Sequence, residues 1–319
     1  MVEIKCIAAE SFGARSMACV VKTRSQKIVI DPGIALDRGR FQLLPHPFQI
    51  VAARVLRINI IHELKDATDV VITHFHGDHH PMVNADIYQL DASNIIPFLQ
   101  KVNIYCKSEE KISSTAKKRR KQLEHLLKKK FNIFEGKIEG NLHFSPPMAH
   151  GEIQQSKNTV MMVGITEGSN RFLFGSDIQM LNSASINWIL DFKPTIAYIA
   201  GPPLYISSVR KKFESFAWNQ AVKLAKNIPT LIIDHHLLRF LEGFDFIDRL
   251  DKNSSGRVLS AADFMGYKRV PLEALRKELY QEMPVSLNWH RNYEMGTESI
   301  EVIQKWRNYS IDSFPPKKA

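Results

Sequence analysis

Thr73-His74-Phe75-His76-Gly77-Asp78-His79-His80 is the most informative segment of this chain. It closes an apolar run, residues 69–73, which we expect to be a buried strand. Proteins of the α/β class usually hold their ligands at the carboxyl end of such a strand. The H-x-H-x-D-H spacing offers two imidazoles to one first-row metal and an Asp-His pair to a second metal. Chance occurrence of this pattern is rare, so we interpret the segment as a metal site.

Length and composition are those of an ordinary globular protein. The 319 residues, 44% hydrophobic and 24% charged, allow one large or two modest domains, and we expect a single domain over residues 1–319. The first residues lack the features of a signal peptide, and no apolar run is long enough to span a membrane, so we expect a cytoplasmic protein. The three cysteines are far apart, without a C-x-x-C pair, and are expected to be reduced and buried.

Positive charge is concentrated in one part of the chain. The formal net charge is +10, and residues 101–130 contain eleven Lys or Arg against three Glu. Such a balance favours anionic partners, among them nucleic acid, phosphate esters and acidic metabolites. The run Lys117-Lys118-Arg119-Arg120-Lys121 fits a phosphate-binding patch over the metal site, although a charged helix face is more often simply solvated.

Secondary structure predicted on both sides of the histidine segment indicates an α/β fold. Further strands are predicted at residues 4–8, 18–22, 27–30, 195–200 and 230–233. Residues 82–140 are predicted to be a basic, mainly helical insertion with one strand at 102–106, and residues 240–319 a helical carboxyl-terminal extension.

The histidine segment resembles the second motif of the metallo-β-lactamase superfamily, and candidates for the other family motifs follow in order. Asp31, in Ile30-Asp31-Pro32-Gly33, matches the first motif, which usually supports the site from behind the ligands. His150 matches the third motif and Asp177, in Gly175-Ser176-Asp177, the fourth, a carboxylate between two metals. His235 or His236 matches the last. We prefer His235, because successive residues at a strand end point to opposite sides and His236 would then face away.

The resemblance implies an αββα sandwich, a site and a chemistry. His74, His76 and His150 would hold one divalent metal, and Asp78, His79 and His235 the other, with Asp177 and a hydroxide between them. Asp78 would also orient the hydroxide, so Asp78 and Asp177 are the expected catalytic carboxylates. The residues expected to contact substrate or support the ligands are Asp31, His80, His236 and Arg239. Zinc is the first expectation for the metal, with iron and manganese as alternatives, since His/Asp sites bind all three.

Three functions remain in competition. The basic segment favours a hydrolase of a phosphodiester or nucleic acid, and hydrolysis of a small thioester, lactone or amide is the runner-up. A non-catalytic nucleic-acid-binding protein is the alternative of another class, but burying so many polar groups without a metal would be costly. Together with Gly201-Pro202-Pro203, the doubled histidines also resemble an archaeal family of predicted metal-dependent hydrolases within the superfamily. That narrower likeness supplies no substrate, and the oligomeric state stays open.

Overall fold

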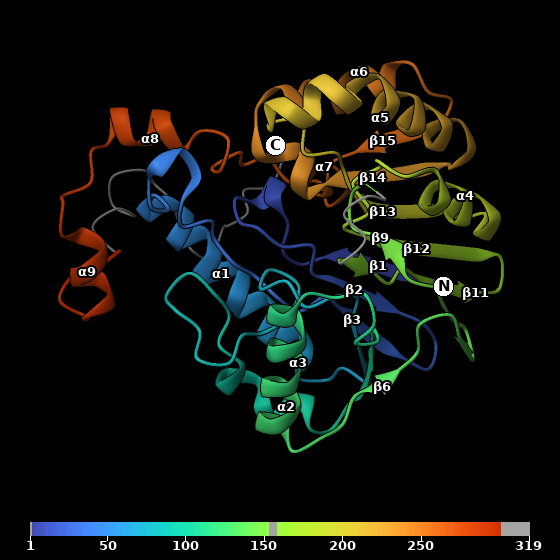
Figure 1. Cartoon of the computed structure of the whole chain (residues 1–319), viewed down its shortest axis with the longest axis horizontal. Helices are drawn as coiled ribbons and strands as arrows, with labels where there is room; N and C mark the ends of the chain where they lie inside the picture. Colours follow the sequence, from blue (N-terminus) through green and yellow to red (C-terminus); the bar gives the residue numbers. More distant parts are fainter. Residues whose placement is uncertain (1, 153–157, 301–319) are drawn as a thin grey trace.

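Two β-sheets face each other in the centre of the molecule, with helices on the outer faces. The computed structural model describes residues 2–152 and 158–300. In Figure 1, α1, α2 and α3 lie on the side of the first sheet, and α4, α5 and α6 on the side of the second. The predicted αββα sandwich is therefore confirmed.

The first sheet comes from the first 133 residues and has the order β1-β2-β3-β4-β5-β6. It begins as an antiparallel meander and becomes parallel from β3 onward. Its strands are β1 (Glu3–Cys6), β2 (Cys19–Lys22), β3 (Lys27–Ile30), β4 (Asp69–Ile72), β5 (Asn103–Cys106) and β6 (Asn132–Ile133). Because β3 and β4 run parallel, their carboxyl ends meet at one edge of the sheet.

The second sheet has the order β15-β14-β13-β12-β11-β8-β7, and its strands from β12 to β15 are parallel. Its strands are β7 (Ile138–Glu139), β8 (Leu142–Phe144), β11 (Val163–Glu167), β12 (Asn170–Ser176), β13 (Ile196–Ala200), β14 (Thr230–Asp234) and β15 (Arg257–Leu259). A separate pair, β9 (Met148–Ala149) and β10 (Thr159–Val160), is antiparallel.

Helices connect the strands and cover the sheets. They are α1 (Pro47–Leu64), α2 (Ile96–Leu99), α3 (Ser114–Leu127), α4 (Ser183–Phe192), α5 (Ser207–Asn227), α6 (Glu242–Lys252), α7 (Ala261–Phe264), α8 (Arg276–Glu282) and α9 (Trp289–Glu294). α1 begins at a capping box, in which the His46 ring accepts a hydrogen bond from a backbone N–H of the first turn and the Gln49 side chain accepts one from the backbone N–H of His46. In the described chain no helix is long and apolar enough to cross a membrane.

The central strands of the second sheet, β12 and β14 among them, are buried on both faces. Phe172, Phe174 and Ile232 point into the core between the two sheets, whereas the intervening Leu173 and Ile233 pack in the core under the helices. This period-two alternation explains the continuous apolar runs in the sequence. Cys6, Cys19 and Cys106 are free and buried, as predicted.

The two segments predicted to be mainly helical also contribute strands. Residues 82–140 contain the predicted strand, β5, but also β6 and β7, which extend one sheet each. In the carboxyl-terminal segment, β15 pairs with β14. The description of both segments as helical was therefore incomplete. The missed strands have two or three residues, too few for a periodic pattern to reveal, and they form because a neighbouring strand offers hydrogen bonds. Residues 301–319 lie outside the described chain.

Candidate metal centre

The candidate site residues follow directly on strand ends. Asp31 comes after β3, His74 two residues after β4, His150 after β9, Asp177 after β12 and His235 after β14. Four of these positions follow parallel strands, whose carboxyl ends meet at one edge of each sheet, and the packing of the two sheets brings the two edges together. His150 instead follows β9 of the separate antiparallel pair. Five loops far apart in the sequence thus converge on one cluster.

Within the described residues, nine side chains form overlapping groups whose nitrogen and oxygen atoms lie within 4.8 Å of one another. The groups are His74, His76, His150 and Asp177; Asp31, His74 and His79; Asp78, His79 and His235; and Asp177, His235 and His236. Every residue that the sequence nominated as a metal ligand is in this cluster, together with Asp31 and His236.

Asp177 lies at the centre of the cluster. Its Oδ2 atom is 3.2 Å from the Nε2 atoms of His150 and His236, 3.3 Å from that of His79 and 3.5 Å from that of His74, and its Oδ1 atom is 3.6 Å from Nε2 of His235. The carboxylate therefore faces ligand candidates from both halves of the molecule.

Asp31 supports the histidine loop from behind. Its carboxylate accepts hydrogen bonds from the backbone N–H of Thr73 at 2.7 Å and from the Thr73 hydroxyl at 2.5 Å, and it lies 2.8 Å from Nδ1 of His79. Donation from Nδ1 leaves Nε2 of His79 to face the cluster. Gly33 allows this close approach, since a Cβ atom there would lie 2.1 Å from the backbone nitrogen of His80.

Several atoms of the cluster are buried without a hydrogen-bond partner among the described residues. They include Nε2 of His74, Nε2 of His79 and Oδ1 of Asp177. Buried polar atoms in native proteins nearly always have a partner, because leaving one unpaired costs free energy. These orphaned atoms belong to imidazoles and a carboxylate, and a divalent first-row cation would satisfy them together. The donor set therefore fits a metal.

Burial and neighbouring charges set the protonation of the cluster. Burial lowers the pKa of His74 to about 4, with a further contribution from His79, and it lowers the pKa of His236 well below the usual value. Neutral imidazole is the form that binds metal. For Asp177, burial alone would raise the pKa, but the surrounding histidines, His79 first, hold it well below its usual range. The carboxylate stays ionised, and its negative charge favours a cation.

Three polar residues beside the ligands carried no signal in the sequence. Arg15 lies 3.4 Å from Asp78 and 3.1 Å from Asp37. Buried Glu10 accepts a hydrogen bond from Arg239 at 3.0 Å, and Gln179, two residues after Asp177, is 3.4 Å from Nδ1 of His150. Of the three, only Gln179 lies close in sequence to a motif residue, two positions after Asp177.

Arg239 reaches the cluster as the sequence suggested, but its guanidinium is already engaged. Besides Glu10, it donates to the Tyr205 hydroxyl at 3.3 Å and lies 3.1 Å from Nε2 of His235 and 3.7 Å from Asp78. The side chain is buried. Of the two arginines near Asp78, Arg15 is therefore the more accessible, with 22% of its side chain exposed against 4% for Arg239.

The expectation that His236 would face away from the site is wrong. β14 ends at Asp234, and His235 starts a 3₁₀ turn, His235–Arg239, with a positive φ of 62°. The alternation of an extended strand no longer applies after this left-handed residue, so both histidines face Asp177. Asp234 fixes the turn by accepting hydrogen bonds from the backbone of His235 at 2.7 Å and of Ser11 at 3.1 Å.

His80 is buried next to the cluster but is not part of it. Its Nδ1 atom lies 2.7 Å from the carbonyl oxygen of Pro81, and burial lowers its pKa to about 4. The neutral ring donates to this carbonyl and so helps to fix the loop that carries His79.

The fold and the site together define the class of this protein. An αββα sandwich with a histidine–aspartate cluster at the carboxyl edge of its strands, in this motif order, is an architecture of the metallo-β-lactamase type. Among curated proteins, the chain is 44% identical over 299 residues to a UPF0282 protein of Methanosarcina mazei, which covers 94% of this chain and 98% of the relative. It is 32% identical to a UPF0282 protein of Pyrococcus furiosus over 86% of this chain and 91% of the relative. The chain belongs to the UPF0282 family.

Other comparisons give weaker likenesses. No family model matches the chain. One similar solved structure is described as a metal-dependent hydrolase of the beta-lactamase superfamily; it has 12% identity and a TM-score of 0.46, over 81% of this chain and 95% of that one. The strand order and the motifs of this chain, rather than that score, define its fold.

Proposed function

We propose that this protein is a metal-dependent hydrolase with a dinuclear His/Asp site. The observation that carries the proposal is the cluster of imidazoles and carboxylates around Asp177, with buried ligand atoms that have no other partner among the described residues. We further propose that residues 1–319 form one domain that works in the cytoplasm.

Each ligand candidate is assigned a role by its place in the cluster. His74, His76 and His150 would hold one metal, and Asp78, His79 and His235 the other, with Asp177 between them. The two metals are divalent, zinc first, with iron or manganese as alternatives. His236 lies as close to Asp177 as His150 does, so it is a second candidate for the ligand from the last motif. Asp31 orients His79 from behind, and Arg239 holds His235 and Asp78 in place.

A bound metal and the side chains around it would contribute different parts of the reaction. When bound, such a metal lowers the pKa of a coordinated water to about 7 and so supplies a nucleophile at neutral pH. Burial alone would raise the pKa of Asp78, but Arg15 and then His235 hold it well below its usual range. The ionised Asp78 can therefore accept a hydrogen bond from the attacking water and orient it. Arg15 is the accessible cation beside it and would contact an anionic group of the substrate.

The substrate class is the finer part of the proposal. The basic segment 101–130 favours a phosphodiester, including nucleic acid. A small thioester, lactone or amide remains the alternative substrate. A protein that binds nucleic acid without catalysis is the alternative function, and it predicts no metal at this cluster.

Elemental analysis of the purified protein tests the proposal. We expect about two metals per chain in the wild type and loss of metal in Asp177→Ala and His150→Ala. His62→Ala, which alters an exposed histidine on α1, is the matched control and should keep its metal. The same samples are assayed with a small chromogenic phosphodiester and a small thioester, and turnover of one of them identifies the substrate class. A wild type that binds no metal and hydrolyses neither substrate would overturn the proposal.

A further inference from the structure

The metal cluster opens to solvent on one side. Within its first group of ligands, His76 and His150 are partly exposed, whereas His74 and Asp177 are buried. Asp78, His79, His235 and His236 are buried as well. A substrate must therefore approach past His76 and His150.

The basic segment borders this opening at two points. Arg119, on α3, donates a hydrogen bond of 3.2 Å to the carbonyl oxygen of Phe75, the residue between the first two ligand histidines. The loop before α3 is attached next to His150, because the carbonyl oxygen of Lys111 accepts a hydrogen bond of 3.1 Å from the backbone of Thr159, which pairs with Ala149. The segment is thus held against both loops that carry the exposed ligands.

Four lysines of this segment are free to meet a partner. Lys111, Lys117, Lys118 and Lys121 are exposed and have no ion-pair partner among the described residues. By contrast, Lys107 is buried and paired with Glu135 at 2.7 Å. Glu110 is the one exposed acidic residue between Lys107 and Lys121. A solvated structural helix would ordinarily intersperse charges of both signs along such a face, so this excess points to a binding surface.

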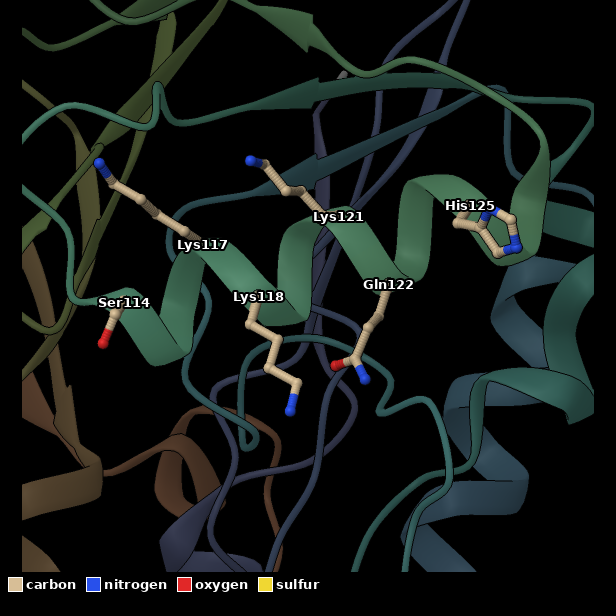
Figure 2. A pocket seen from close by; sticks show the side chains of 6 residues that line it. All are labelled: Ser114, Lys117, Lys118, Lys121, Gln122 and His125. Atoms are coloured by element: carbon tan, nitrogen blue, oxygen red, sulfur yellow. The ribbon is translucent and has the colours of Figure 1, made fainter.

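The shape of the helix surface fits a repeating anion. A hollow of about 500 Å³ is lined by Ser114, Lys117, Lys118, Lys121, Gln122 and His125. Figure 2 shows two rows along α3, with Lys117 and Lys121 on one side and Lys118 and Gln122 on the other. Residues four apart are separated by about 6 Å along a helix, so the charges are spread out instead of converging on one point. A single phosphate is usually held by converging donors, whereas a chain of phosphates is met by a row of cations.

We propose that the exposed face of α3, formed by Lys117, Lys118 and Lys121, is the docking surface for a polynucleotide whose phosphodiester is delivered to the metal centre. This inference rests on the proposed hydrolase function and names its substrate. Lysines dominate the lining of the hollow, and the one ring in it is the imidazole of His125. Binding should therefore rely mainly on the phosphate backbone and depend strongly on salt and little on base sequence.

The test replaces the three lysines and measures binding separately from hydrolysis. The variant Lys117→Gln/Lys118→Gln/Lys121→Gln is compared with wild type and with Lys223→Gln/Lys226→Gln/Lys252→Gln. The control removes the same charge from exposed positions on α5 and α6. Those positions precede β14 and β15, at the edge of the second sheet opposite the metal centre. Fluorescence anisotropy with labelled single-stranded RNA and DNA of mixed sequence gives the affinity over a range of salt concentrations.

We expect the α3 variant to lose about tenfold or more in affinity at low salt and the slope of log K against log salt to fall by about 2, given about 0.7 per phosphate contact on a single strand. Its ratio of oligonucleotide cleavage to hydrolysis of a small phosphodiester should also fall about tenfold, while the control triple keeps the wild-type affinity and ratio. Equal losses in both triples, or no loss in the α3 variant, would overturn the inference, as would binding to anionic lipid vesicles but to neither oligonucleotide. Because binding is measured without turnover, a metal-free, inactive protein that still binds RNA through α3 would contradict the proposed hydrolase and not this surface.

Discussion

The two sheets each present a pair of consecutive histidines at their functional edges, and the two pairs behave differently. In His79-His80, at the first sheet, one ring faces Asp177 and the other turns away to the Pro81 carbonyl. In His235-His236, at the second sheet, both rings face Asp177. The sequence is the same dipeptide in both places, so the backbone decides which rings reach the site. The left-handed conformation of His235 is the difference in the second pair.

The comparison also separates two ways of supporting a ligand. At the first edge, Asp31 fixes His79 by accepting from its Nδ1 atom. At the second edge, Glu10 and Arg239 surround His235, 3.4 Å from its Nδ1 atom and 3.1 Å from its Nε2 atom, respectively. A carboxylate behind one histidine favours a single tautomer, whereas a carboxylate and a guanidinium on opposite sides of the other ring hold it in position.

Removing the residue that joins the two edges should have the largest effect. Asp177→Ala deletes the carboxylate that both histidine pairs face, and it leaves buried imidazoles without their counter-charge. We expect metal affinity to fall by more than the 10- to 100-fold that is typical of supporting residues, together with loss of hydrolysis. Asp191→Ala, at an exposed position on α4, should keep both. An Asp177→Ala protein with wild-type metal content, measured by elemental analysis after dialysis, would rule out a shared ligand.

Replacing one histidine of each pair by alanine tests whether the two pairs differ in metal binding. His236→Ala should weaken metal binding by about 10- to 100-fold, because its Nε2 atom points to Asp177, while His80→Ala should keep the wild-type stoichiometry. Calorimetric titration of the two metal-free variants with zinc gives the zinc affinity of each. Equal effects of the two substitutions would mean that both pairs act alike.

Each edge also brings one arginine to Asp78, and the two should differ in function. Arg15 is partly exposed, so Arg15→Ala should raise KM for an anionic substrate by about tenfold, the effect of one lost charged hydrogen bond, with metal content unchanged. Arg15→Lys should recover part of this loss. If Arg15→Ala lowers kcat with an unchanged KM, the residue positions Asp78 and does not bind substrate.

The smallest expected effect concerns His80 and pH. Burial lowers its pKa to about 4, below the ordinary 6.5 of the unfolded chain. The unfolded state therefore takes up the proton first as pH falls, and the stability that depends on neutral His80 is complete above pH 6.5 and lost toward pH 4. In the metal-free protein we expect about 2 kcal/mol of this loss between pH 7 and pH 5.

His80→Asn keeps an N–H donor for the Pro81 carbonyl but does not titrate. Urea unfolding of this variant at the two pH values should show a smaller loss of stability than the wild type. The same loss in both proteins would assign the acid sensitivity to the histidines of the cluster.

Features that depend on neighbouring residues in the sequence could be predicted, and features that depend on distant contacts could not. The strands predicted at residues 27–30 and 69–73 were correct because an apolar run is a property of a short stretch of sequence. β6, β7 and β15 were missed because two or three residues carry no period and become strands only beside a partner. His236 was placed on the wrong side because the alternation rule assumes an extended strand, and His235 is not extended.

By itself, the sequence indicated an α/β protein, and its resemblance to the metallo-β-lactamase superfamily implied the αββα sandwich and the ligand candidates. The motifs that carry this resemblance, H-x-H-x-D-H first, each depend on a few consecutive residues. Only the tertiary structure decided that both His235 and His236 face Asp177, and that Arg15 and Glu10 lie beside the ligands. It also attached α3 to the histidine loop through Arg119 and the carbonyl oxygen of Phe75. The physical reason is that these contacts join segments up to 229 residues apart, and no local pattern encodes a distance that the packing of two sheets creates.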